Sequence, residues 1–285
     1  VTEALLVELE KIANNMKAYA EARTNFLPLY AFYLLAEFRE KRAFPIIVRM
    51  IKSNQDDVDS LLGNVITEGL ASILASTFDG NLDCLYEVIT NLDLDEYVRG
   101  AAFNSLEILN KNNIISQEEI IKMIDSMLSN ELKDDDSVVI ADIVTFISRN
   151  QIYDRIDLVR SLYAQDRVDV QMIGDYDQFV DDLYGKIEYH DSRDMIEDIV
   201  KSLSWWACFK KDSEDDEIEL DKKPIEVVAE LLKVRLVDSQ ILTIGGKLFL
   251  RGVVAENHPR RIRGREIHEC KNRHRNDEDR WNDYE

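Results

Sequence analysis

The chain has 285 residues, of which 45% are hydrophobic and 32% are charged, and its formal net charge is −21. This balance indicates a folded protein and excludes a generally disordered chain. An acidic field of this size repels nucleic acid, so we do not expect the main body to bind DNA or RNA.

Glycine and proline are scarce, at 10 and 4 residues. A sandwich or barrel would need a turn signal about every dozen residues, so the composition favours an all-α fold. The three cysteines, Cys84, Cys208 and Cys270, form no CxxC pair. They predict no disulfide framework and fit a reducing, cytoplasmic setting. We expect no membrane span, since no apolar run approaches about 18 residues, and the first residues lack the basic region of a secretory signal.

The first part of the chain has the pattern of amphipathic helices joined by short loops. One helix is predicted over residues 2–22. The next four are predicted at residues 29–40, 42–53, 58–77 and 82–91. Pro28 and Pro45 suit first helical turns, and Phe78-Asp-Gly80 is typical of a helix C-terminus. These helices therefore follow one another as pairs.

Two further pairs continue the pattern. Their helices are predicted at residues 95–111, 116–130, 136–149 and 153–165. Ser116 and Glu119 resemble a capping box. The second helices of the four pairs begin near residues 44, 81, 116 and 153, at offsets of 37, 35 and 37 residues. Such a regular period predicts an α-solenoid of stacked antiparallel helix pairs.

The regular period is lost after Val170. We expect two more helices, at residues 175–184 and 191–209, which complete a repeat domain over residues 1–210. The acidic residues 211–223 are predicted to form a loop or linker. Residues 224–250 are predicted as a C-terminal helix, running from Pro224 to about Val237, and a turn. The basic residues 251–285 are expected to be disordered.

Two segments of the array resemble a known family. They are Thr67-Glu68-Gly69-Leu70 and the helix start Tyr97-Val98-Arg99, and the similarity covers about residues 25–210. The chain is similar to a bacterial family of uncharacterised HEAT-like repeat proteins, a domain of unknown function. The resemblance implies a HEAT-like α-solenoid in a bacterial cytosol and supplies no catalytic residues. Some members end in a cysteine-rich zinc-binding tail of the SEC-C kind, but Cys270 is the only cysteine here after residue 210.

The sequence contains no Gly-x-Ser-x-Gly elbow, no phosphate loop and no GxGxxG motif, so we expect no enzyme activity and no cofactor. His268, Cys270 and His274 bring zinc-type ligands close together, although a structural zinc site usually begins with a paired half-site. A polar tail is the favoured interpretation. The arginine-rich residues 260–275 can neutralise phosphates or fold back on the acidic body. Because they lack interleaved aromatics, we favour intramolecular pairing or disorder over nucleic-acid binding.

Four residues are candidates for contact with a partner. Trp205 and Trp206 can form a docking patch or cover the end of the array, and we favour the covering role. Glu68 and Arg99 lie in the family-like segments. They can form an ion pair between repeats or face a groove, and we favour the structural role.

Taken together, these features predict a non-enzymatic scaffold that binds a protein or peptide along one face of a helical array. A basic or amphipathic partner suits the acidic field. Two alternatives stay open. One is a nucleic-acid or phosphate binder acting through the basic tail, and the other is an enzyme-associated subunit with an unrecognised carboxylate site.

Overall fold

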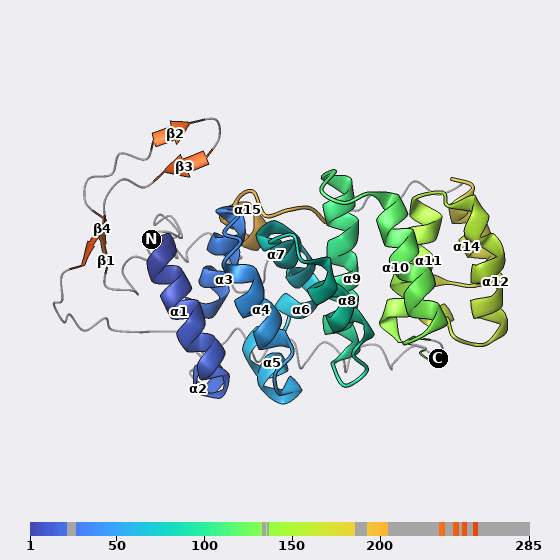
Figure 1. Ribbon diagram of the computed structural model, residues 1–285, viewed down its shortest axis with the longest axis horizontal. Coiled ribbons are helices and arrows are strands. Elements are labelled where there is room, and N and C mark those ends of the chain that lie inside the picture. Colours follow the sequence, from blue (N-terminus) through green and yellow to red (C-terminus); the bar gives the residue numbers. More distant parts are fainter. Residues whose placement is uncertain are drawn as a thin grey trace, which may run out of the picture.

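The computed structural model describes residues 1–21, 27–132, 135, 137–185 and 193–204, together with the backbone of four short strands between residues 234 and 255. Within residues 1–204 the described part is all-α. Figure 1 shows the helices following one another in an elongated row, with α1 at one end and α12 and α14 at the other. This confirms the predicted all-α class.

The helices fall into a regular succession. In chain order they are α1 (Thr2–Asn14), α2 (Met16–Glu21), α3 (Leu27–Glu37), α4 (Ala43–Ile51), α5 (Gln55–Leu62), α6 (Val65–Glu68), α7 (Leu70–Thr77), α8 (Leu82–Thr90), α9 (Glu96–Lys111), α10 (Gln117–Ser129), α11 (Val138–Arg149), the 3-10 helix η1 (Tyr153–Arg155), α12 (Ile156–Ala164), α13 (Val170–Ile173), α14 (Tyr176–Leu183) and α15 (Ile199–Leu203).

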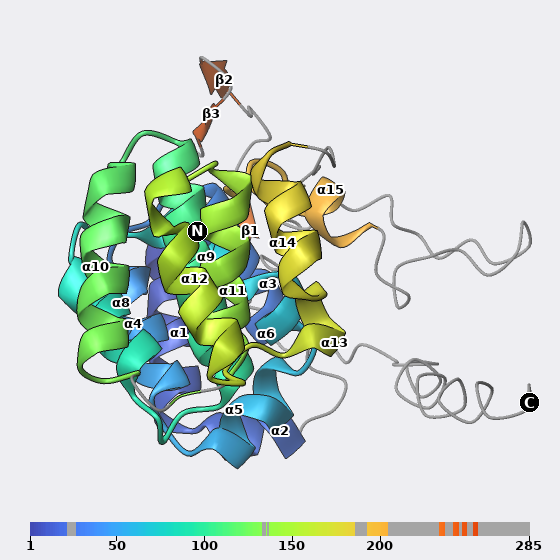
Figure 2. The same ribbon diagram turned by 90° about the vertical axis from the view of Figure 1, so that its right-hand side faces the viewer.

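Five of these helices form a continuous inner file. Along the row, α3 packs on α7, α7 on α9, α9 on α11, and α11 on α14. Seen along the row, α4, α8 and α10 lie on the opposite side from α3 and α14 (Figure 2). Each helix of the file therefore contacts the one before it and the one after it.

Most of the predicted boundaries of the paired helices are confirmed. The second helices begin at Ala43, Leu82, Gln117 and, with η1, Tyr153, close to the predicted starts. Asp95 caps α9 by accepting hydrogen bonds from two backbone N–H groups. The capping box of Ser116 and Glu119 is present at the start of α10.

Three of the predicted helices are wrong in extent. The helix over residues 2–22 breaks at Asn15, between α1 and α2. The helix predicted over residues 58–77 is instead three helices. Gly63 adopts φ +47° at the end of α5, and Gly69 separates α6 from α7. Of residues 191–209, only Ile199–Leu203 are described as helix, and residues 193–198 are not helical. Periodicity alone does not detect such breaks, since the apolar spacing continues across them.

Helix α7 lies at the centre of the core. All eight of its residues are buried, including Ser72, Ser76 and Thr77. Large aromatic side chains fill the space between successive pairs, with edge-to-face contacts of Phe44 with Phe78 and of Phe103 with Phe146. A helix that is buried all round needs neighbours on every side, and the row supplies them.

Arg99 joins three parts of the row. Its side chain is only 4% exposed and donates from Nε to the carbonyl of Ile89 at 2.9 Å, at the end of α8. The same guanidinium pairs with Asp135 at 2.7 Å, in the loop before α11. Arg167, which follows α12, binds the carbonyls of Leu132 and Asp135 in that loop. The two arginines therefore hold the α10–α11 loop against the pairs on both sides of it.

Gly69 allows α3 to approach the start of α7 closely. A Cβ atom on Gly69 would lie 2.1 Å from the hydroxyl oxygen of Tyr33, which is buried in α3. No side chain fits in that space without displacing the tyrosine ring. The glycine of the Thr67-Glu68-Gly69-Leu70 segment is therefore required by helix packing.

Four short strands lie beyond the helices. They are β1 (Val234–Leu236), β2 (Leu242–Ile244), β3 (Lys247–Phe249) and β4 (Val253–Ala255). Both pairings are antiparallel, β1 with β4 and β2 with β3. Strand β1 replaces the last turn of the helix predicted to reach Val237, and β4 lies within the residues 251–285 expected to be disordered. The predicted acidic linker at residues 211–223 lies outside the described residues.

Removing the Arg99 side chain should destabilise the whole row. We expect Arg99→Met to lower the free energy of unfolding by about 3–5 kcal/mol, because it leaves the nearly buried Asp135 carboxylate without its countercharge. Urea unfolding followed by circular dichroism measures the loss. Arg49→Met is the matched control, since its ion pair with Glu10 is about half exposed and such pairs contribute little. Equal losses in the two variants would contradict the structural role of Arg99.

A side chain at Gly69 should also be costly. We expect Gly69→Ala to lower the free energy of unfolding by roughly 1–3 kcal/mol, as overpacking in a core usually does. Adding Tyr33→Phe should restore part of the loss, because it removes the hydroxyl oxygen nearest the new methyl group. A double-mutant cycle on urea midpoints measures the coupling between the two positions. Additive losses would show that the two residues do not compete for the same space.

Candidate functional site

A non-helical stretch of the chain returns across one edge of the row. Residues 193–198 lie over the C-terminal ends of α9, α7 and α3 and lead into α15, which packs on α3 (Figure 1). We call this stretch, together with its continuation to Ile199, the return segment. It places residues next to others that precede them by 82 to 162 positions in the chain.

The return segment first meets the end of α9. Lys111, the last residue of that helix, donates from Nζ to the carbonyl of Arg193 at 3.1 Å and pairs with the Asp194 carboxylate at 2.9 Å. Asn112 donates from its side-chain amide to Asp194 at 2.9 Å. One cation and one amide of the helix end therefore bind both a main-chain carbonyl and an acidic side chain.

The segment then crosses α7 and α3. The N–H of Ile196 donates to the Ser76 hydroxyl at 2.8 Å, and Arg39 donates to the carbonyl of Ile196 at 2.5 Å. The N–H of Ile199 donates to the Glu37 carboxylate at 2.9 Å. Ile196 and Ile199 are only 5% and 4% exposed. Side chains from two helices thus bind the backbone of the segment while its isoleucines enter the core.

The C-terminal ends of three inner helices, α3, α9 and α11, have similar backbone conformations. Arg39, Asn113 and Gln151 have positive φ of 53°, 56° and 52°, directly beyond the ends of α3, α9 and α11. Such left-handed residues close a helix C-terminus, where the aligned peptide dipoles leave a partial negative charge. Lys111 and Arg149 occupy the last turns of α9 and α11. The edge therefore carries Lys111 and Arg149 in the last turns of α9 and α11 and Arg39 beyond α3, whereas the last turn of α7 has no basic residue.

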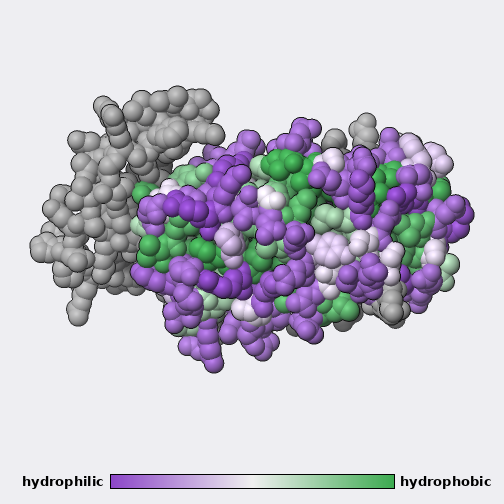
Figure 3. Space-filling view, viewed as in Figure 1, coloured by the Kyte–Doolittle hydropathy of each residue, from purple (hydrophilic) through white to green (hydrophobic). Residues whose placement is uncertain are grey.

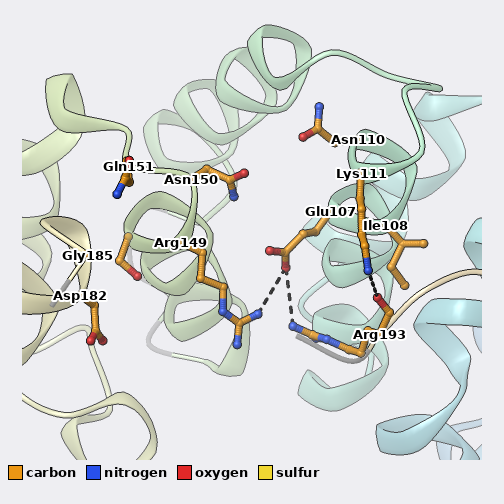
Figure 4. A pocket seen from close by; sticks show the side chains of 11 residues that line it. Glu107, Ile108, Asn110, Lys111, Arg149, Asn150, Gln151, Asp182, Gly185 and Arg193 are labelled. Atoms are coloured by element: carbon orange, nitrogen blue, oxygen red, sulfur yellow. Dashed lines mark hydrogen bonds and ion pairs between the residues drawn. The ribbon is translucent and has the colours of Figure 1, made fainter. Parts of the chain in front are cut away.

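A cleft of about 420 Å³ opens beside the return segment, between the C-terminal ends of α9, α11 and α14 (Figure 4). The side chain of Arg193 points into it and lies 3.5 Å from the Glu107 carboxylate. Arg149 approaches the same carboxylate from α11 at 3.6 Å. Glu107 thus lies between two guanidinium groups, one from the row and one from the segment.

Other acidic groups near the cleft have altered acidity. Burial raises the pKa of Asp182, which lines the cleft, and the neighbouring Asp181 adds to the effect. Burial also raises the pKa of Asp142 to about 7, although its Oδ2 accepts a hydrogen bond from Asn104. A Cβ on Gly100 would lie 2.7 Å from that Oδ2 atom. Asp142 is therefore wedged between α9 and α11 and does not line the cleft.

Two exposed tyrosines stand next to the cleft. Tyr153 and Tyr184 are 48% and 58% exposed, and their ring centroids lie 5.5 Å apart. Each is within two residues of a position that lines the cleft. The face shown in Figure 3 is mostly hydrophilic, with apolar residues in separate areas. Tyrosine is enriched where proteins bind one another, so this pair extends the site toward α14.

Of the four sequence-predicted partner residues, the structure describes Arg99 and Glu68. Arg99 forms an ion pair between repeats, as favoured, but its partner is Asp135. Glu68 is exposed, and no ion pair joins it to Arg99. Trp205 and Trp206, the metal candidates His268, Cys270 and His274, and the arginine-rich residues 260–275 lie outside the described residues. In the described part of the chain, no group of three His, Cys, Asp or Glu side chains could hold a metal ion.

The groups that bind the return segment were not identified from the sequence. Lys111 and Arg149 had a detectable signal, since a cation in the last turn of a helix complements the helix dipole. No sequence signal marks Ser76, Glu37 or Ile196, because residues of these types are common in helices and loops. Their association depends on contacts between residues that are 120 or more positions apart in the chain.

The comparison with protein families matches residues 1–210 to the family described as "Protein of unknown function (DUF1186)". The chain belongs to this family. The match covers the whole row, the return segment and α15. The DUF1186 assignment confirms the resemblance to a domain of unknown function and adds residues 1–24 to the similar region.

Curated relatives of this DUF1186 chain are known from Chlamydia. An uncharacterised protein of Chlamydia trachomatis serovar D is 34% identical over 133 residues, which are 47% of this chain and 53% of the relative. An uncharacterised protein of Chlamydia muridarum is 33% identical over 133 residues, with the same coverage. The chain therefore spans about half the length of the curated relatives it matches.

No solved structure matches this chain. Among the residues that the structure describes, no helix is both long and apolar enough to cross a membrane.

The raised pKa of Asp142 predicts a pH-dependent stability. The folded state holds this proton up to about pH 7, whereas the unfolded chain releases it near the ordinary value of 3.8. The folded state binds more protons between these values, so this contribution to stability is lost as pH rises through about 7. We expect Asp142→Asn to lose less free energy of unfolding than the wild type between about pH 5 and pH 8. Urea midpoints at both pH values test this, and equal losses would contradict it.

Proposed function

We propose that this protein is a non-enzymatic α-solenoid of HEAT-like type that binds a protein or peptide partner at the surface of its helical row. Three features support the solenoid arrangement: the regular starts of the second helices, the inner file of successive contacts, and the arginines that join neighbouring pairs. Rigid stacked pairs present an extended surface that needs little ordering on binding.

The return segment is the observation that carries this proposal. Side chains at the ends of three successive inner helices bind a non-helical stretch of chain through its own N–H and C=O groups. Main-chain recognition of this kind does not depend on the bound sequence, while pockets for side chains add selectivity. The edge of the row thus has the contacts that a peptide-binding surface requires.

The site chemistry favours binding over catalysis. The group with a strongly raised pKa, Asp142, is packed between two helices and bonded to Asn104. Two carboxylates line the cleft: Asp182, whose pKa is raised by burial, and Glu107, which lies between two arginines. Charged pairs of this kind orient a ligand and do not by themselves supply a nucleophile with an adjacent base. The enzyme-associated alternative therefore has less support.

The overall charge bears on how a partner approaches. A net charge of −21 attracts a partner with a basic surface and speeds its encounter at low ionic strength. The nucleic-acid alternative depends on the basic tail, most of which lies outside the described residues.

Site-specific cross-linking tests the proposal. We expect a photoreactive amino acid at Tyr184, beside the cleft, to capture one stoichiometric partner from a native extract. The same group at Val7, which is equally exposed at the other end of the row, is the matched control and should capture none. The cross-link should weaken at high salt if the acidic field assists the encounter. Absence of any stoichiometric adduct at Tyr184, or the same adducts at both positions, would contradict the proposal.

A further inference from the structure

The return segment has the features of a ligand that is bound in cis. Among the described residues, no backbone–backbone hydrogen bond joins residues 193–197 to the rest of the chain. The hydrogen bonds that hold its backbone come instead from side chains of the row: Lys111, Ser76, Arg39 and Glu37. A strand or helix of the core would be held through backbone ladders. Side-chain recognition of a main chain is typical of peptide-binding grooves.

The groups of the row that bind the segment are costly to bury alone. With the segment in place, burial raises the pKa of Glu37 and lowers the pKa of Arg39. The N–H of Ile199 and the C=O of Ile196 offset that cost. An occupant that supplies an N–H and a C=O at these positions therefore satisfies the groove, whichever chain it belongs to.

The side chains of the segment define the occupant. Arg193 enters the cleft toward Glu107, Asp194 binds Lys111 and Asn112, and Ile196 is buried beside α7. The pattern is an arginine, an acidic residue, any residue and an isoleucine. The polar anchors are weak ones, because the Lys111–Asp194 pair is about half exposed and the Arg193–Glu107 distance is 3.5 Å. Burial of the isoleucine is therefore the main anchor.

We propose that the line of helix C-termini from α9 to α3 is a peptide groove, that residues 193–199 occupy it in cis, and that the partner inserts an extended Arg-acidic-x-aliphatic segment in their place. The inference rests on the proposed binding function and names the segment that the partner supplies. The return segment then competes with the partner. The apparent affinity for the partner is the intrinsic affinity multiplied by the fraction of molecules in which the groove is open.

Peptide binding to the full chain tests this competition. The probe is a fluorescent synthetic peptide with the sequence of residues 191–204, measured by anisotropy. Ile196→Asp with Ile199→Asp unseats the cis segment and leaves the groove intact, so the peptide should bind roughly tenfold tighter or more than to the wild type. Val200→Asp is the matched control, since Val200 adjoins Ile199 but is 49% exposed; it should bind like the wild type. Adding Arg39→Met to the unseated chain should weaken binding again.

Hydrogen exchange of the unmodified chain gives a readout that needs no variant. If the segment is a displaceable occupant, the amides of Ile196 and Ile199 exchange by local opening, faster than core amides of α7 and α9. Excess unlabelled peptide should speed their exchange further. Protection equal to that of the core would overturn the inference, as would a folded unseated chain that binds the peptide no tighter than the wild type. Either result would overturn the groove and leave the proposed binding function standing, because the Tyr184 cross-link tests that function separately.

Discussion

The buried guanidinium of Arg99 is the contact on which the row depends most directly. It binds a carbonyl at the end of α8 and the carboxylate of Asp135 before α11, so it joins the second pair, the third pair and the loop that leads to the fourth. A buried charge is tolerated only when its partners are fixed in position. Arg99 therefore couples stability to the register of stacking. Arg167 binds the same loop from the following pair and continues this arrangement along the row.

Stacking in register also produces the candidate site. Because the inner helices run in the same direction, their C-termini form one edge of the row, and left-handed residues follow three of them, α3, α9 and α11. The dipoles of these ends attract cations, so Lys111 and Arg149 are stable there. They are then in position to meet carbonyls and carboxylates of a chain that crosses the edge. Fold stability and the proposed peptide recognition thus use the same helix-end chemistry.

The sequence predicted helix caps more reliably than helix breaks. The caps at Asp95 and Ser116 were recognised because each is completed within a few residues. The breaks at Gly63 and Gly69 were missed because the apolar period runs through them. At Gly69 the reason is the Tyr33 ring, 36 positions away in the chain, which leaves no room for a side chain. The ion pair of Arg99 was anticipated as structural, but the expected partner was Glu68 and the observed one is Asp135, because the pairing depends on how the loop before α11 packs.

The sequence alone determined the all-α class, the regular starts of the second helices and the caps, because helix periodicity and capping depend on residues within one or two turns of each other. It also indicated a family of unknown function over about residues 25–210, and the family match extends this to residues 1–210. Only the tertiary structure decided that residues 193–198 leave helical conformation and cross the ends of three earlier helices. That choice depends on Ser76, Glu37 and Arg39 being brought together with Ile196. No local pattern encodes it, because contacts between distant residues exist only once the helices have stacked.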